Sequence, residues 1–125
     1  MDRASPHLPH AAPIEAYGKG GFRFAGMSHR GSLLCLPEGI WPAPVGGPQD
    51  ITAGAFDLVF SAEPHVGHCL IGTGRDPWVL PQDLRARFQE SRVAVETMTT
   101  GAAVRTYNIL VGEGRRVAAL LIAVD

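Results

Sequence analysis

The chain has 125 residues, 46% of them hydrophobic and 18% charged, which predicts a globular protein with a buried core and excludes a disordered chain. Its 11 basic and 12 acidic residues give a formal net charge of −1, so no overall positive field gathers nucleic acid or anionic lipid. The longest apolar run, residues 117–124, is far shorter than the ~20 residues of a membrane-spanning helix. We expect a cytoplasmic protein without a transmembrane segment and without a nucleic-acid partner.

The N-terminal part of the sequence predicts a β-rich layer. Residues 1–13 hold three prolines without hydrophobic periodicity, and we expect a flexible leader before a single domain over residues 14–125. Short apolar or alternating segments, separated by glycines, predict strands over residues 14–17, 22–25 and 27–36.

Prolines and glycines dominate the segment that follows this layer. Residues 38–49 contain three of each, which predicts a long irregular connection. Asp50 or Thr52 then stands in position to cap a short helix that runs through Phe60, because apolar residues recur on one side of that segment.

The C-terminal half alternates strands and helices. Strands are expected over residues 66–71, 93–98 and 117–124, and helices over residues 81–91 and from Thr100 to Gly112 or Gly114. The uniformly apolar last strand predicts a central position with both faces covered. The alternation predicts an α/β fold, with a right-handed crossover between the first two of these strands.

Cysteine and histidine positions give no strong sign of metal binding or catalysis. Cys35 and Cys69 lie in apolar runs and form no CxxC pair, so we expect buried free thiols in a reducing compartment. His65 and His68 are three residues apart, and on a strand they point to opposite faces. They could share an ion only if His65 still lay in the preceding loop. No metal site, catalytic residue or cofactor is expected.

The segment LIGTGRDP, residues 70–77, raises the question of a phosphate-binding loop. Gly72, Thr73 and Gly74 follow a predicted strand, and ligands of α/β sheets bind at the carboxyl ends of strands. However, no helix begins directly after these glycines and no P-loop lysine follows, so the usual amide donors are missing. The segment therefore favours a tight strand exit that requires glycine.

The start of the last helix is the second candidate site. Thr99, Thr100 and Arg105 could bind an anionic group at the same sheet edge as the glycine turn. Alternatively, the threonines cap the helix, the small residues pack against the sheet, and Arg105 pairs with a carboxylate. We expect Tyr107 to be buried on the apolar side of this helix, and Asn108 to bond the backbone of a neighbouring strand end or turn.

Several blocks of this sequence resemble one family of small single-domain proteins that is widespread in bacteria and archaea. The blocks are IEAYG with Gly21-Phe22, LIGTG, the segment AAVRTYNIL with EGR, and the closing apolar run, within residues 13–125. The family includes the mitochondrial NADH:ubiquinone oxidoreductase (complex I) assembly factor 3 and adipogenesis-associated relatives. The resemblance implies a three-layer α/β fold with a central mixed sheet and no established enzymatic activity. Thr99 stands where the family often has aspartate, and Val104 where it often has cysteine, which weakens a catalytic interpretation.

Two functions are therefore expected as alternatives. The first is a non-enzymatic protein-binding factor that assists assembly of a membrane (respiratory) complex, with an exposed apolar patch near Trp41 or Trp78. The second is a small-molecule binder or enzyme, with a concave site into which Arg105 or Tyr107 faces. The candidate ligand or partner site comprises Gly72, Thr73, Gly74, Thr99, Thr100, Arg105, Tyr107 and Asn108. The partner and the oligomeric state do not follow from the sequence.

Overall fold

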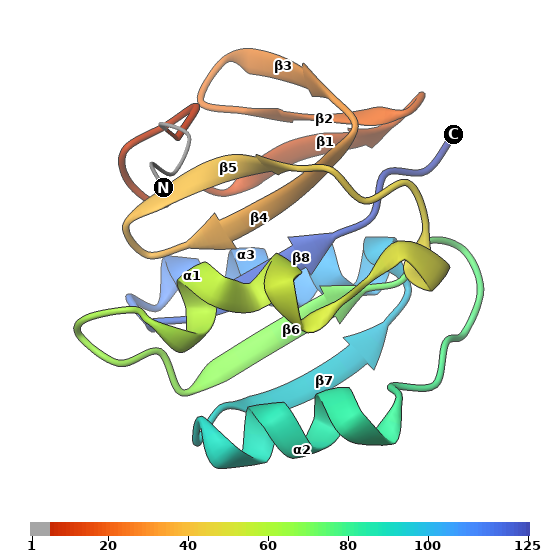
Figure 1. The fold of residues 1–125 in the computed structure, drawn as a ribbon. Helices are drawn as coiled ribbons and strands as arrows, with labels where there is room; N and C mark the ends of the chain where they lie inside the picture. Colours follow the sequence, from red (N-terminus) through yellow and green to blue (C-terminus); the bar gives the residue numbers. More distant parts are fainter. Residues whose placement is uncertain (1–5) are drawn as a thin grey trace.

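Two β-sheets organise the computed structural model, which describes residues 6–125 (Figure 1). The N-terminal sheet is antiparallel, and its strands are β1 (Ile14–Gly18), β2 (Gly21–Phe24) and β3 (Met27–Arg30). The central sheet has the spatial order β5 (Gly39–Ala43), β4 (Ser32–Leu36), β8 (Ala118–Leu121), β6 (His68–Gly72), β7 (Ala94–Met98). In this sheet β4 is antiparallel to β5 and β8, whereas β6 is parallel to β7 and β8. The expected single α/β domain with a central mixed sheet is confirmed.

Helices and the N-terminal sheet cover the two faces of the central sheet. The helices are α1 (Asp57–Phe60), α2 (Gln82–Glu90) and α3 (Thr100–Gly112). On one face, α1 and α2 enclose a core that contains Phe56, Phe88 and Leu120. On the other face, α3 and the N-terminal sheet enclose a second core that contains Phe24 and Tyr107. The strand β8 lies between these cores with every residue buried, as its uniformly apolar sequence predicts.

The sequence-based boundaries are wrong in two places in the N-terminal half. The strand predicted over residues 27–36 is two strands, because Gly31 lies between β3 and β4 with φ +100° and turns the chain into the second sheet. The connection predicted over residues 38–49 contains β5, which pairs with β4. Pro42 suits that strand because β5 lies at the sheet edge, where a missing amide donor costs nothing.

The short helix expected before Phe60 is also irregular. It consists of two 3₁₀ turns, Pro48–Asp50 and Ala53–Phe56, and the single α-helical turn α1. Thr52 precedes the second 3₁₀ turn but makes no side-chain capping bond. In contrast, α2 agrees with the sequence pattern, with Pro81 immediately before it and Leu84 and Phe88 buried.

The N-terminal segment reaches the edge of the central sheet. Leu8 forms an antiparallel bridge with Ile40 of β5, and Ala12 is buried. Residues 1–5 of the predicted leader lie outside the described residues. Between residues 6 and 125, none of the helices has the length and apolar character that crossing a bilayer requires.

Candidate functional site

The glycine turn after β6 and the start of α3 meet at one edge of the central sheet, as the strand order predicts (Figure 1). The Thr73 amide donates to the Met98 carbonyl at 2.8 Å, and the Thr100 amide donates to the Gly74 carbonyl at 2.9 Å. The Gly74 amide donates to the Thr100 hydroxyl at 2.9 Å, and that hydroxyl donates to the Ile122 carbonyl at 2.7 Å. The amides of Thr73 and Gly74 are therefore engaged by the protein itself.

The glycines at this edge are required by backbone geometry and packing. Gly74 has φ +93°, a conformation that side-chain-bearing residues rarely adopt. A Cβ on Gly72 would lie 3.0 Å from the Thr100 Cα and 3.1 Å from the Ala103 Cβ. These two observations support the interpretation of the segment as a tight strand exit against which α3 packs.

Replacing Gly74 with alanine is expected to lower the free energy of unfolding by about 1–2 kcal/mol, because the Cβ of alanine is sterically strained at a positive φ. Chemical denaturation measures this difference. Gly112→Ala is the control, since Gly112 lies in the last turn of α3 and nothing stands within 4 Å of its added Cβ. That variant should be as stable as the original chain or slightly more stable. If Gly74→Ala kept full stability while a thermal upshift with ATP or NAD disappeared, the turn would be a ligand loop instead.

One of the two threonines expected to cap α3 does so. The Thr99 side chain, rather than that of Thr100, accepts the Ala102 amide at 3.3 Å and caps the helix. Thr100 is fully buried and ties the glycine turn to the end of β8. Both threonines thus have structural partners, but among residues 6–125 Arg105 forms none of the ion pairs that this alternative expected.

A shallow hollow lies beside this edge. Residues 73–78, 46–49 and 122–125 line it, and its volume is about 560 Å³. Arg75 and Asp125 both line it, and the Arg75 guanidinium donates to the Asp125 carbonyl. Thr73 and Gly74 line this hollow, but Arg105 and Tyr107 do not. The residues of the candidate site therefore do not form one pocket.

Tyr107 and Asn108 instead hold the N-terminal sheet against α3. Tyr107 is fully buried, and burial together with the neighbouring Cys35 thiol raises the pKa of its hydroxyl. The Asn108 side-chain amide donates to the Ile14 carbonyl at 2.9 Å, and its carbonyl accepts the Ile14 amide at 2.8 Å. The expectation that Asn108 bonds a neighbouring strand end is confirmed. Arg105 is exposed near Gly101.

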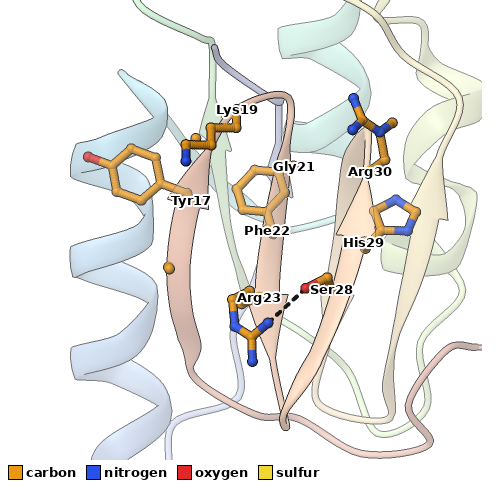
Figure 2. A pocket seen from close by; sticks show the side chains of 10 residues that line it. Tyr17, Lys19, Gly21, Phe22, Arg23, Ser28, His29 and Arg30 are labelled. Carbon is orange, nitrogen blue, oxygen red and sulfur yellow. Dashed lines mark hydrogen bonds between the residues drawn. The ribbon is translucent and has the colours of Figure 1, made fainter.

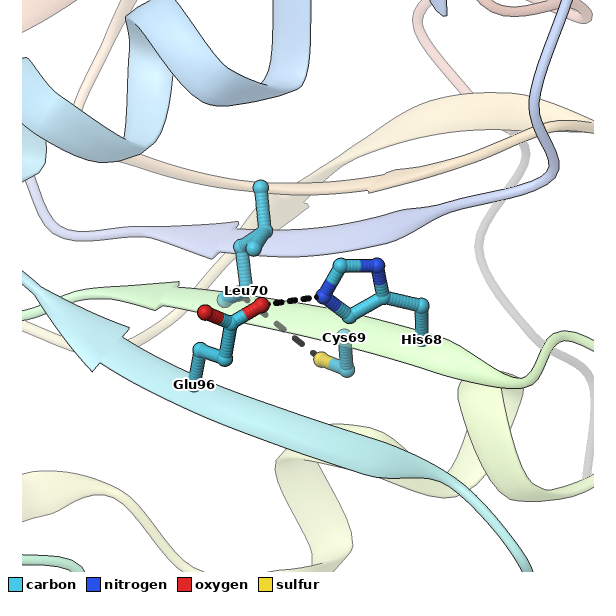
Figure 3. Close-up of polar contacts among 4 residues, drawn as sticks. All are labelled: His68, Cys69, Leu70 and Glu96. Carbon is cyan, nitrogen blue, oxygen red and sulfur yellow. Dashed lines mark hydrogen bonds and ion pairs between the residues drawn. The ribbon is translucent and has the colours of Figure 1, made fainter. Parts of the chain in front are cut away.

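The neighbouring residues His68 and Cys69 of β6 have separate partners (Figure 3). The His68 Nε2 lies 2.6 Å from a Glu96 carboxylate oxygen, and the His65 Nε2 lies 3.0 Å from the Arg92 carbonyl. Cys69 follows His68 on β6 but is fully buried, with its thiol 3.7 Å from the Leu70 carbonyl. Within residues 6–125, no group of three or more histidine, cysteine or acidic side chains is placed to hold a metal ion.

Both thiols are expected to react slowly in the folded protein. Burial raises the pKa of Cys35 to about 12 and also raises the pKa of Cys69. At neutral pH, the thiolate fraction of Cys35 is on the order of 1,000 times smaller than that of free cysteine. Labelling with a thiol reagent should therefore be slow without denaturant and fast with it. Rapid labelling of Cys69 in the native protein would contradict its burial.

The two tryptophans are half-buried rather than exposed. Trp41 and Trp78 pack against the core on the α2 face. An exposed apolar side chain nearby is Val79, which is 86% exposed and follows Trp78 in the loop before α2.

Sequence reasoning missed a second hollow on the N-terminal sheet (Figure 2). Its volume is about 550 Å³, and its lining includes Lys19, Arg23 and Arg30. The Arg23 Nη1 donates to the Ser28 hydroxyl at 2.9 Å. The available signal was the alternation Phe22-Arg23-Phe24, which places Arg23 on the face opposite the two buried rings.

Comparison with known proteins finds relatives that match most of this chain. An uncharacterised protein of Rhodobacter capsulatus is 38% identical over 98% of this chain and 93% of its own length. NADH dehydrogenase [ubiquinone] 1 alpha subcomplex assembly factor 3 of Mus musculus is 37% identical over 92% of this chain. This chain spans 62% of the length of that mouse protein.

Solved structures and a family model agree with these similarities. The crystal structure described as an outer membrane protein from Bartonella henselae has a TM-score of 0.90 and 50% identity, covering 95% of this chain and 100% of that one. The model of the family described as "Protein of unknown function (DUF498/DUF598)" matches residues 14–122. The resemblance carried by the sequence blocks is confirmed, and the chain belongs to the DUF498/DUF598 family.

Proposed function

We propose that this domain is a non-enzymatic protein-binding factor that assists the assembly of a respiratory membrane complex. The observation that carries the proposal is the similarity to the mouse complex I assembly factor 3, which extends over 92% of this chain. The similarity therefore extends over most of this domain, rather than over one short motif.

The geometry of the glycine turn favours this function over binding of a small phosphorylated molecule. A phosphate loop offers free amide donors at a helix start. Here the Thr73 and Gly74 amides donate to the Met98 carbonyl and the Thr100 hydroxyl. The residues that looked most suited to a ligand thus stabilise the fold.

A chimera tests the proposal directly. In mouse cells from which assembly factor 3 has been removed, the matching 116-residue segment of that factor is replaced with this chain. Assembled complex I is then measured on native gels. We expect the chimera to restore most of the complex, whereas the mouse factor with the segment deleted restores none. The proposal fails if the chimera accumulates to the level of the mouse factor and the complex stays at the level of the deletion.

A further inference from the structure

We propose that the outer face of the N-terminal sheet binds an extended acidic segment of a protein partner. This inference rests on the proposed function, in that the ligand is taken to be a protein. It adds the location of the contact and its chemistry. The face, called here the basic face, consists of the outward residues Ala16, Gly18, Gly21, Arg23, Ser28 and Arg30, with Lys19 in the β1–β2 turn.

The strand register defines which side chains form the basic face. Arg23 pairs with Ser28, and Gly21 pairs with Arg30, so all four share one face of the sheet. The alternate residues Phe22 and Phe24 are buried in the core beneath. Arg23 and Arg30 are exposed.

The charge of the basic face is positive, and none of the ion pairs among residues 6–125 involves its cations. Lys19, Arg23 and Arg30 line the hollow, and none of the aspartates or glutamates within residues 6–125 does. Among the described residues, the ion pairs that form involve other basic side chains: His68, Arg115 and Arg116. Like charges gathered on neighbouring strands repel each other unless an anion lies between them. The chain as a whole has a net charge of −1, so this concentration of positive charge is local to the basic face. A partner surface with negative charge would complement it.

The floor of the basic face is low because its central residues are small. A Cβ on Gly21 would lie 2.2 Å from the His29 carbonyl oxygen, so only glycine fits at that position. With Ala16, Gly18 and Ser28 around it, the floor leaves a hollow of about 550 Å³ beneath the basic side chains (Figure 2). A flat lipid surface reaches protruding cations but does not fill a hollow, whereas a peptide side chain does.

The spacing of the two arginines matches an extended peptide. Arg23 faces Ser28, and Arg30 is two residues further along β3, so the arginines are diagonal neighbours. Such positions lie about 7–8 Å apart. Side chains at positions i and i+2 of an extended peptide lie on one side, about 7 Å apart. Glutamates at those two positions can each form an ion pair with one of the guanidinium groups. The Arg23 guanidinium donates one of its five N–H groups to Ser28, which leaves the others for a carboxylate.

A labelled peptide provides the probe. Fluorescence anisotropy is measured with an eight-residue peptide of alternating glutamate and threonine, and with its glutamine counterpart. The original chain should bind the glutamate peptide at least tenfold more tightly than the glutamine peptide, and more weakly as salt rises. The variant Arg23→Glu/Arg30→Glu should lose at least tenfold in affinity. The matched control, Arg85→Glu/Arg92→Glu, changes the net charge equally at exposed sites outside the basic face and should stay within twofold.

Several outcomes would overturn the inference. Equal losses in the two double variants, with circular dichroism showing both folded, would mean non-specific charge attraction. Binding to phosphatidylserine vesicles without binding to the glutamate peptide would assign the basic face to a membrane. In the chimera, Arg23→Glu/Arg30→Glu should abolish assembly. Full assembly with that variant would remove the basic face as the contact while leaving the proposed function intact. If the chimera with the original chain does not restore complex I, the proposed function fails, and the peptide measurement alone tests whether the basic face binds an acidic segment.

Discussion

Replacing Phe88 with alanine is expected to lower the free energy of unfolding by about 3–5 kcal/mol, because it deletes a buried ring at the centre of an aromatic cluster. Phe88 is fully buried on α2. Its ring centroid lies 5.0 Å from those of Phe56 and Phe60, in edge-on contacts. The three rings hold α2 and the irregular segment around α1 on the central sheet. Such pairs add about 0.5–1.5 kcal/mol each beyond the area that they bury.

Denaturant titration followed by circular dichroism measures this loss. The control is Ile109→Ala, which removes an apolar side chain of α3 that is 62% exposed and should change stability by less than about 0.5 kcal/mol. A loss below about 1 kcal/mol for Phe88→Ala would show that the cluster around α1 collapses into the cavity, and that the packing described for this face is loose.

Replacing Asn108 with alanine should lower the free energy of unfolding by about 2–4 kcal/mol, since it leaves both backbone groups of Ile14 without partners. Asn108 bonds the amide and the carbonyl of Ile14 across 94 residues of sequence. Ile14 is only 4% exposed, so water replaces these bonds poorly. The loss should appear in hydrogen exchange as weakened protection of β1.

The matched control for this prediction lies on the same helix. Thr106→Ala alters a half-buried side chain two residues away and should change stability by about 0.5 kcal/mol or less. An unchanged melting curve for Asn108→Ala would remove its structural role and direct attention to a functional one.

The sequence predicts the C-terminal half of the fold well because helical and strand periods dominate there. The apolar residues of α2 recur every four positions, and β8 is apolar throughout, so both elements follow from local patterns. In the N-terminal half, tertiary structure overrides the local pattern. Gly31 separates two strands that read as one, and Pro42 is compatible with β5 only because that strand lies at an edge.

The candidate site shows the same limit in a different way. The sequence places the glycine turn and the start of α3 at one sheet edge, and the structure does so too. The sequence does not reveal that the Thr100 hydroxyl accepts from the Gly74 amide and donates to the Ile122 carbonyl, because those residues come together only in the folded sheet. The basic face was missed for a similar reason. Its cations are scattered over a hairpin and a turn, and only the register of β2 with β3 gathers them.

The central position of β8 has a consequence for how the molecule opens. The β4–β5 hairpin and the parallel β6–β7 pair have no hydrogen-bonded contact with each other except through β8, which pairs with β4 on one side and β6 on the other. Loss of β8 would expose two strand edges at once and uncover both cores. We therefore expect the amides of β4 and β6 that bond β8 to exchange with solvent through the same opening event, with the two halves of the sheet behaving as one cooperative unit.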